Sequence, residues 1–211
     1  MIKVHVTKKL LAKLPLNEDG FLPAPTKIHY SEEKKTQLKN PLSHWHANLL
    51  VLQRRNCILM LHDATRFPVF IPCLKKPDFA QLDYQFANAY MNTILKAGFS
   101  EKLMETADQY LAPICCDADT NRSVLGTMNQ MKSAIENMLW YDHVSVSEIT
   151  GYRVGAWLAD TPCTVKGQKN VVWPQQAMQE LLTKNSLPRD SIPGQAESPL
   201  PDNVIALDKY R

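Results

Sequence analysis

Trp45-His46-Ala47-Asn48-Leu49-Leu50-Val51-Leu52 is the stretch that decides the fold, because its later part is apolar at successive positions. A strand that is covered on both faces has this pattern. Two more apolar runs follow, at residues 57–61 and 67–71, and short polar turns separate the three. Connections this short favour an antiparallel meander. Pro68 has no amide donor, so the third strand is expected at an edge of the sheet or at a bulge.

Helices are expected after the meander. Asp78 is a suitable N-cap for a helix that Gly98 ends, and Ser100 is suitable for the next helix. A third helix is predicted over residues 122–140, because apolar residues recur there at helical spacing. This apolar stripe consists of Val124, Met128, Met131, Ile135, Met138 and Leu139.

The sequence therefore predicts an α+β fold, in which helices at residues 78–111 and 122–140 pack on one face of an antiparallel sheet. Residues 2–6 alternate between apolar and polar and are expected to add a strand. A small C-terminal α/β extension completes the domain. In this extension residues 152–158 and 171–173 are interpreted as strands, and a helix begins at Pro174 and runs to about Asn185. The predicted divisions are a core at residues 1–140 with an irregular insert at 15–43, the extension at 141–186 and a Pro-rich tail at 187–211.

The composition is that of a globular protein, since hydrophobic residues make up 45% of the 211 and charged residues 21%. No apolar run approaches the roughly 20 residues that span a bilayer, and the N-terminus has no apolar signal-peptide core. We therefore expect a cytoplasmic protein with no membrane partner. The five cysteines show no CxxC spacing, which favours reduced thiols over a disulfide framework.

The net charge of +3 is unevenly distributed along the chain. Residues 1–76 contain 13 Lys/Arg and 5 Asp/Glu, a net +8, whereas residues 77–211 carry a net −5. This asymmetry indicates either an anionic partner, such as nucleic acid, or two halves that neutralise each other across the fold.

Four segments occur in a recognisable order along the chain. They are Thr7-Lys8-Lys9-Leu10-Leu11, Trp45-His46-Ala47-Asn48-Leu49, Arg54-Arg55-Asn56-Cys57 and Thr120-Asn121-Arg122-Ser123-Val124-Leu125-Gly126-Thr127-Met128-Asn129. Together they resemble an uncharacterised bacterial domain family, some members of which occur beside plasmid or mobile-element genes. The resemblance covers roughly residues 1–140, and its last segment is the most specific. It implies no reaction, cofactor or catalytic residue.

That last segment, the signature, is also the main candidate for a binding site. Thr120 or Asn121 can cap the helix that follows it, and donors near a helix N-terminus suit a phosphate or a carboxylate. A glycine early in a helix costs about 1 kcal/mol relative to alanine, which a closely approaching backbone or ligand would explain. The structural alternative is that Arg122 pairs with a carboxylate such as Asp117 or Asp119, and that Asn129 satisfies carbonyl groups at the edge of a strand. The candidate anion-binding residues are Asn121, Arg122, Ser123, Gly126 and Asn129.

His44 and His46 lie two residues apart, so on a strand both would project to one face. Some zinc sites use this spacing, and His62, Asp63 or a cysteine would have to complete the set. Two histidines are not four ligands, so no metal or other cofactor is expected. Solvent-facing or hydrogen-bonded histidines are the alternative.

A basic surface at one end of the sheet is a further hypothesis. Such a surface would contact phosphates without reading bases. His46, Trp45 and Tyr30 are candidate stacking groups for single-stranded nucleic acid, although Trp45 leads into an apolar strand and also suits a core position. The basic residues are Lys8, Lys9, Arg54, Arg55, Lys75 and Lys76.

The leading functional hypothesis is a cytosolic, non-enzymatic binding module for a protein or nucleic acid, linked to mobile-element or defence biology. The alternative is an enzyme that acts on a nucleotide or nucleic acid, with Arg122 as phosphate clamp and His46 or His62 as acid or base. No GxSxG, GxGxxG, HExxH or Walker-type pattern is present. The sequence gives no reaction and no oligomeric state.

Overall fold

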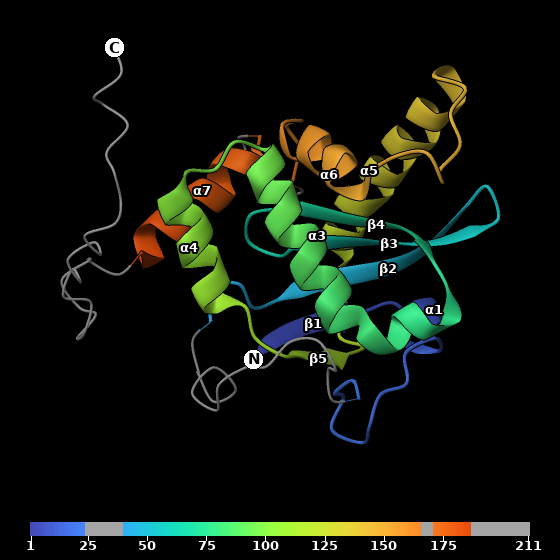
Figure 1. Ribbon diagram of the computed structural model, residues 1–211, viewed down its shortest axis with the longest axis horizontal. Helices are drawn as coiled ribbons and strands as arrows, with labels where there is room; N and C mark the ends of the chain where they lie inside the picture. The colour runs from blue at the N-terminus through green and yellow to red at the C-terminus, as the bar shows by residue number, and fades with distance from the viewer. Residues whose placement is uncertain (24–39, 166–170, 187–211) are drawn as a thin grey trace, which may run out of the picture.

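A computed structural model describes residues 1–23, 40–165 and 171–186 (Figure 1). One sheet of five strands lies at its centre, in the order β4-β3-β2-β1-β5. The strands are β1 (Ile2–Val6), β2 (Trp45–Leu52), β3 (Arg55–His62), β4 (Pro68–Leu74) and β5 (Ile114–Asp117). The tail at residues 187–211 and most of the insert, residues 24–39, lie outside the described residues.

The predicted meander is confirmed, because β2, β3 and β4 pair antiparallel in chain order. Pro68 begins β4 at the sheet edge, where a missing amide leaves no unpaired partner inside the sheet. Strand β1 pairs in parallel with both β2 and β5, so the sheet is mixed. Parallel neighbours need long crossover connections, which the insert and the helices between β4 and β5 supply.

Helices cover both faces of this sheet. On one face lie α3 (Leu82–Lys96), α4 (Glu101–Tyr110) and α7 (Pro174–Asn185), and on the other lies α5 (Arg122–Tyr141). The prediction that the helices of residues 78–111 and 122–140 share one face was wrong. Strand β2 shows the reason, since Trp45 and Ala47 belong to the core under α3, whereas Leu50 and Leu52 belong to the core under α5.

The C-terminal extension differs most from its prediction. Residues expected to form a strand at 152–158 form α6 (Gly151–Ala159) instead, which packs against β4 and α3. Its glycines permit this close approach, because a Cβ at Gly151 would lie 2.4 Å from the Phe70 carbonyl oxygen. Only Val172 of the strand predicted at 171–173 forms a bridge, with Cys163. Helix α7 has the bounds predicted for it.

Two short helical segments complete the described part. Helix α1 (Lys8–Leu11) follows β1, and the 3-10 helix η1 (Lys76–Gln81) precedes α3. The prediction of Asp78 as an N-cap is wrong, because Lys75 is the N-cap of η1 and Asp78 is its third residue, which accepts from the Lys75 amide at 2.6 Å. Helix α3 follows η1, with Gln81 as its N-cap. Gly98 ends α3 with φ +78°, as predicted.

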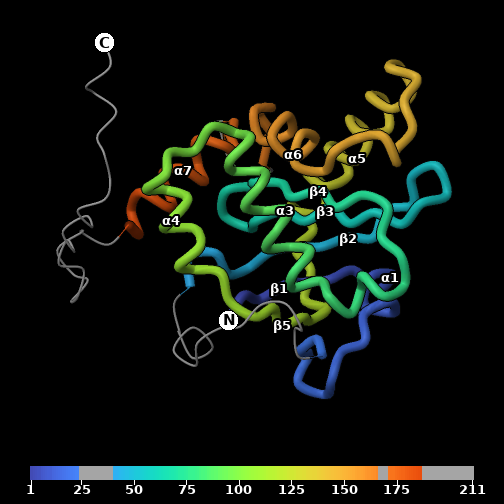
Figure 2. Tube along the Cα trace, viewed as in Figure 1, coloured from blue at the N-terminus to red at the C-terminus, as the bar shows by residue number. Residues whose placement is uncertain are grey.

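Helix α5 connects two distant parts of the molecule. At about 1.5 Å per residue, its 20 residues span roughly 30 Å. Figure 2 shows it running behind the sheet, so that its end approaches the turn between β2 and β3. Its predicted apolar stripe is confirmed, because five of the six side chains are buried in the core under the helix and Met138 is partly buried against it. The polar and aromatic residues at the two ends of the helix lie outside this stripe and are available for other contacts.

Candidate functional site

The start of α5 is fixed by hydrogen bonds at its cap. Asn121 is the N-cap, and its side chain accepts from the Ser123 amide at 2.8 Å. The backbone amide of Asn121 donates to Nε2 of His46 on β2, also at 2.8 Å. A histidine from the middle of the sheet therefore anchors the signature.

The other candidate residues of the signature differ in burial. Arg122 and Asn129 are exposed, and Arg122 makes no ion pair with another described residue, so its predicted pairing with Asp117 or Asp119 is not formed. Ser123 Oγ is buried without a partner among the described residues. A Cβ at Gly126 would meet no described atom within 4 Å, so no close backbone approach explains this glycine.

A chain of titratable groups lies beside this cap. His5 on β1 is in register with His46 on β2 and with Asp117 on β5. Asp117 Oδ1 lies 2.6 Å from His5 Nδ1, and His5 Nε2 lies 3.2 Å from Nδ1 of the exposed His44. The His5 ring centroid is 4.9 Å from that of His46. Strand register thus brings together residues that are 112 positions apart.

Sequence reasoning missed His5 and the role of Asp117. The alternation in residues 2–6 does place His5 on the polar side of β1, opposite Ile2 and Val4. The parallel pairing of β1 with β5, which brings Asp117 alongside, has no signal in the local sequence. Pairing between strands far apart in the chain is therefore what assembles this site.

His46 and His62 are buried, and burial lowers the pKa of each to about 4. His62 bonds to Thr65 Oγ1 through Nδ1 and to the carbonyls of Pro41 and Ser43 through Nε2. It therefore joins two loops and presents no nitrogen outward. Nδ1 of His46 has no partner among the described residues. Neither histidine is an accessible acid or base.

The predicted metal and stacking groups are placed as follows. Within the described ranges, no three His, Cys, Asp or Glu side chains are grouped in a way that could hold a metal ion. Trp45 is fully buried, and its indole donates to the Leu42 carbonyl at 2.7 Å, so it is a core residue and not a stacking platform. Tyr30 lies outside the described residues.

All six residues of the predicted basic surface are exposed. The register of β3 places Arg55 opposite Leu52 and Asn56 opposite Leu74, so Arg54 and Arg55 lie at the same end of the sheet as Lys75 and Lys76. Helix α1, with Lys8 and Lys9, lies toward that end in Figure 1. A single basic surface formed by all six side chains stays a prediction.

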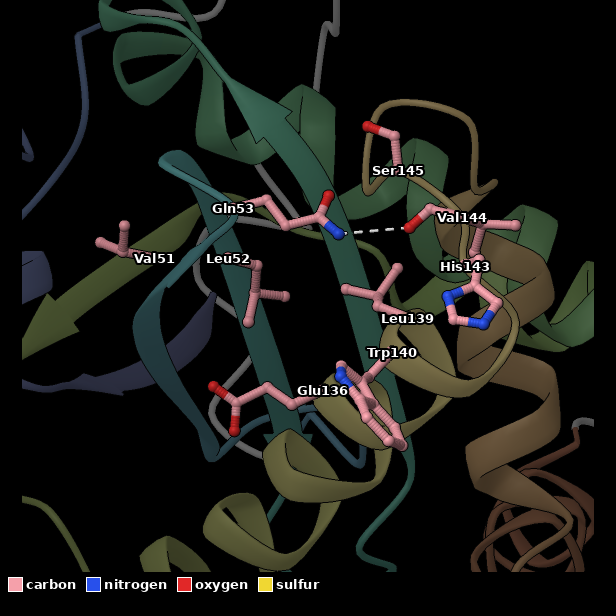
Figure 3. Close-up of a pocket in the computed structure, with 9 residues that line it drawn as sticks. All are labelled: Val51, Leu52, Gln53, Glu136, Leu139, Trp140, His143, Val144 and Ser145. Atoms are coloured by element: carbon pink, nitrogen blue, oxygen red, sulfur yellow. Dashed lines mark hydrogen bonds between the residues drawn. The ribbon is translucent and has the colours of Figure 1, made fainter.

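A hollow of about 550 Å³ lies at the other end of α5, between that helix, the loop after it and the end of β2 (Figure 3). Gln53 braces it, donating to the Val144 carbonyl and accepting from the Val146 amide. The exposed fraction of Trp140 is 68% and that of the neighbouring Tyr141 is 70%. The residues that line this hollow are Val51, Leu52, Gln53, Glu136, Leu139, Trp140, His143, Val144 and Ser145.

A second hollow, of about 360 Å³, lies between the same loop and α6. Val144 lines both hollows, and Trp157 of α6, which is 43% exposed, lines the second. The sequence indicates the exposed aromatic surface at the end of α5. The apolar stripe of the helix buries Leu139, so Trp140 and Tyr141 turn toward solvent.

No helix in residues 1–23, 40–165 and 171–186 combines the length and the apolar character needed to cross a bilayer.

Comparison with known proteins places the chain in a family. No curated protein and no solved structure matches it. A family model described as a domain of unknown function, DUF6933, matches residues 3–177. The match extends beyond Trp140, where the resemblance in the sequence ended, and includes α6 and the start of α7. The chain belongs to this uncharacterised family, DUF6933, which has no assigned activity.

Proposed function

We propose that this protein is a cytoplasmic binding module that recognises a protein partner through the surface at the end of α5. The observation that supports this proposal is the pair Trp140 and Tyr141, two large aromatic side chains exposed beside a 550 Å³ hollow. Their ring centroids lie 4.8 Å apart at 79°. Aromatic residues dominate the binding energy of protein interfaces, and contiguous exposed apolar surface marks interaction sites.

The occupant that this surface suits is an apolar side chain of a partner protein. Leu52 and Leu139 form the floor, and Glu136 and Gln53 provide polar groups at the rim. Such an apolar floor within a polar rim is the usual anatomy of a protein interface.

Charge around the hollow favours protein over nucleic acid. Glu136 is the only Asp, Glu, Lys or Arg among the described residues that line this hollow, and Asp142, Glu148 and Arg153 line the second hollow. Lys132 and Glu136 are paired at 3.4 Å. A nucleic-acid site would need a net positive field to attract phosphates. Exposed aromatics without that field fit a protein partner better.

The test is affinity capture from the native host with three forms of the protein. The wild type should retain specific proteins, the double variant W140A/Y141A should lose them, and W173A should keep them as the matched control, since Trp173 is also exposed but lies before α7. Binding of each recovered protein is then measured with the purified pair. We expect the double variant to bind about tenfold or more weakly, and moderate salt to leave wild-type binding nearly unchanged.

Two outcomes would contradict the proposal. Nucleic acid that is retained and then released by salt would replace the protein partner with a phosphate-bearing one. Self-association that W140A/Y141A abolishes would make a second copy of this chain the occupant.

A further inference from the structure

We propose that Asp117, His5 and His44 form an acid–base relay that promotes attack of water on a phosphoester. The relay is separate from the surface at the end of α5, because it lies near the start of that helix. The relay rests on the order of its groups: a partly exposed carboxylate, a buried imidazole and an exposed imidazole, joined through 2.6 Å and 3.2 Å contacts.

The bond partners set the tautomers of both histidines. A carboxylate accepts only, so Asp117 requires the proton of neutral His5 on Nδ1. His5 Nε2 then has a lone pair, and the contact with His44 requires the proton of neutral His44 on its Nδ1. The lone pair of His44 Nε2 is thus left free. Because His44 is exposed, this nitrogen is available to a ligand as a base.

The backbone around His44 is fixed. Nε2 of His62 is hydrogen-bonded to the Ser43 carbonyl, and the Lys3 amide donates to Ser43 Oγ. The Asp63 amide donates to the His44 carbonyl at 2.8 Å. His44 itself adopts φ 66°, a left-handed conformation that is uncommon for residues other than glycine. Such conformations cluster at functional sites, where surrounding contacts hold them in place.

Two exposed cations belong to segments that adjoin the relay, and their chemistry suits a phosphate group as its ligand. Arg122 follows the cap residue that bonds to His46, and Lys3 lies on the same side of β1 as His5. Neither forms an ion pair with a described residue. Three carboxylates belong to the same segments as the relay. Asp117 is part of the relay, Asp63 pairs with Arg66 at 3.0 Å, and Asp119 is exposed. A guanidinium and an ammonium suit the equatorial oxygens of a phosphoester.

The step requires only water as co-reactant. His44 Nε2 removes a proton from water while the water oxygen bonds to phosphorus and the bond from phosphorus to the leaving oxygen breaks. The imidazolium of His44 then returns its proton to the leaving oxygen. Asp117 and His5 are positioning residues, because they hold His44 in one tautomer and stabilise its positive charge through His5.

The test uses bis(p-nitrophenyl) phosphate and p-nitrophenyl phosphate as probes with the full chain. The wild type should hydrolyse at least one of them, and H44A should lower the rate about 100-fold or more. D117N should lower it as well, because an amide can donate to His5 Nδ1 and reverse its tautomer. R122A should raise KM more than it lowers kcat. Lys96 is exposed at the end of α3 and belongs to neither candidate site, so K96A should match the wild type.

A readout other than activity is the ¹⁵N spectrum of the histidine rings. The wild type should show His5 protonated at Nδ1 and an unprotonated Nε2 on neutral His44, and D117N should change the His5 signal. The relay is refuted if the wild type hydrolyses neither probe, if H44A hydrolyses them as fast as the wild type, or if His5 is protonated at Nε2.

Discussion

The two ends of α5 expose different chemistry. At its start, hydrogen-bonded polar groups meet: Asn121 bonds to the buried His46, beside the pair His5 and Asp117. At its end, Trp140 and Tyr141 are exposed next to an open hollow. The apolar stripe between them holds the helix to the sheet. A long helix that is anchored along its middle can therefore present a rigid polar site at one end and an aromatic surface at the other.

Replacing His46 should have the largest effect on stability. H46A leaves the Asn121 amide without its acceptor and opens a cavity at a fully packed position. We expect the free energy of unfolding to fall by about 2–4 kcal/mol in denaturant titrations. The control K96A, at an exposed residue at the end of α3, should change it by about 0.5 kcal/mol or less. Equal losses in the two variants would contradict the structural role of His46.

The same variant should alter the pH dependence of stability. The pKa of His46 is about 4 in the folded protein and 6.5 when unperturbed, so the unfolded chain binds more protons between these values. Its contribution is therefore complete above about pH 6.5 and is lost as the pH falls toward 4. H46A should lose less stability than the wild type over that range. An unchanged slope in unfolding experiments at several pH values would show that His46 is not buried in its neutral form.

Asp83 gives a contrasting titration on the other face of the sheet. Burial raises its pKa to about 6, and it accepts from the Ile114 amide at 2.9 Å. A raised carboxyl pKa means that the folded state binds the proton more tightly, so Asp83 reduces stability as the pH rises from about 4 to 6. D83N keeps an acceptor without charge and should gain about 1–2 kcal/mol at pH 7, measured by urea unfolding. A loss at that pH would contradict this account.

Replacing Gly126 should have the smallest effect on stability, and it tests the packing at the start of α5. Because no described atom lies within 4 Å of a Cβ there, G126A should raise the free energy of unfolding by about 0.5–1 kcal/mol. G151A is the matched helical control and should destabilise, since its Cβ would meet the Phe70 carbonyl. A destabilised G126A would indicate a close contact at that glycine.

Local pattern predicted much of the fold and little of the site. The meander, the stripe of α5 and the bounds of α7 follow from periodicity, turns and a helix-starting proline. The side on which each helix packs does not, because a two-faced apolar strand accepts helices on either side. The strand predicted at residues 152–158 is wrong for a related reason, because Gly155 permits close packing of α6 against Thr93 of α3, which alternation does not reveal.

The candidate sites show the same limit. Residue type and position predict Thr120 or Asn121 as the cap of α5, and the structure shows that it is Asn121. His5 and Asp117 meet only because β1 lies in parallel between β2 and β5, a pairing that no local motif encodes. The aromatic surface depends on a helix phase that the stripe fixes, so Trp140 could have been placed outside from the sequence.

Hydrogen–deuterium exchange of the protein, free and bound to its recovered partner, tests the central claim most directly. We expect slower exchange at residues 136–157, which include both hollows, and unchanged exchange at residues 114–123. Protection at residues 114–123 with none at 136–157 would contradict the assignment of partner binding to the end of α5.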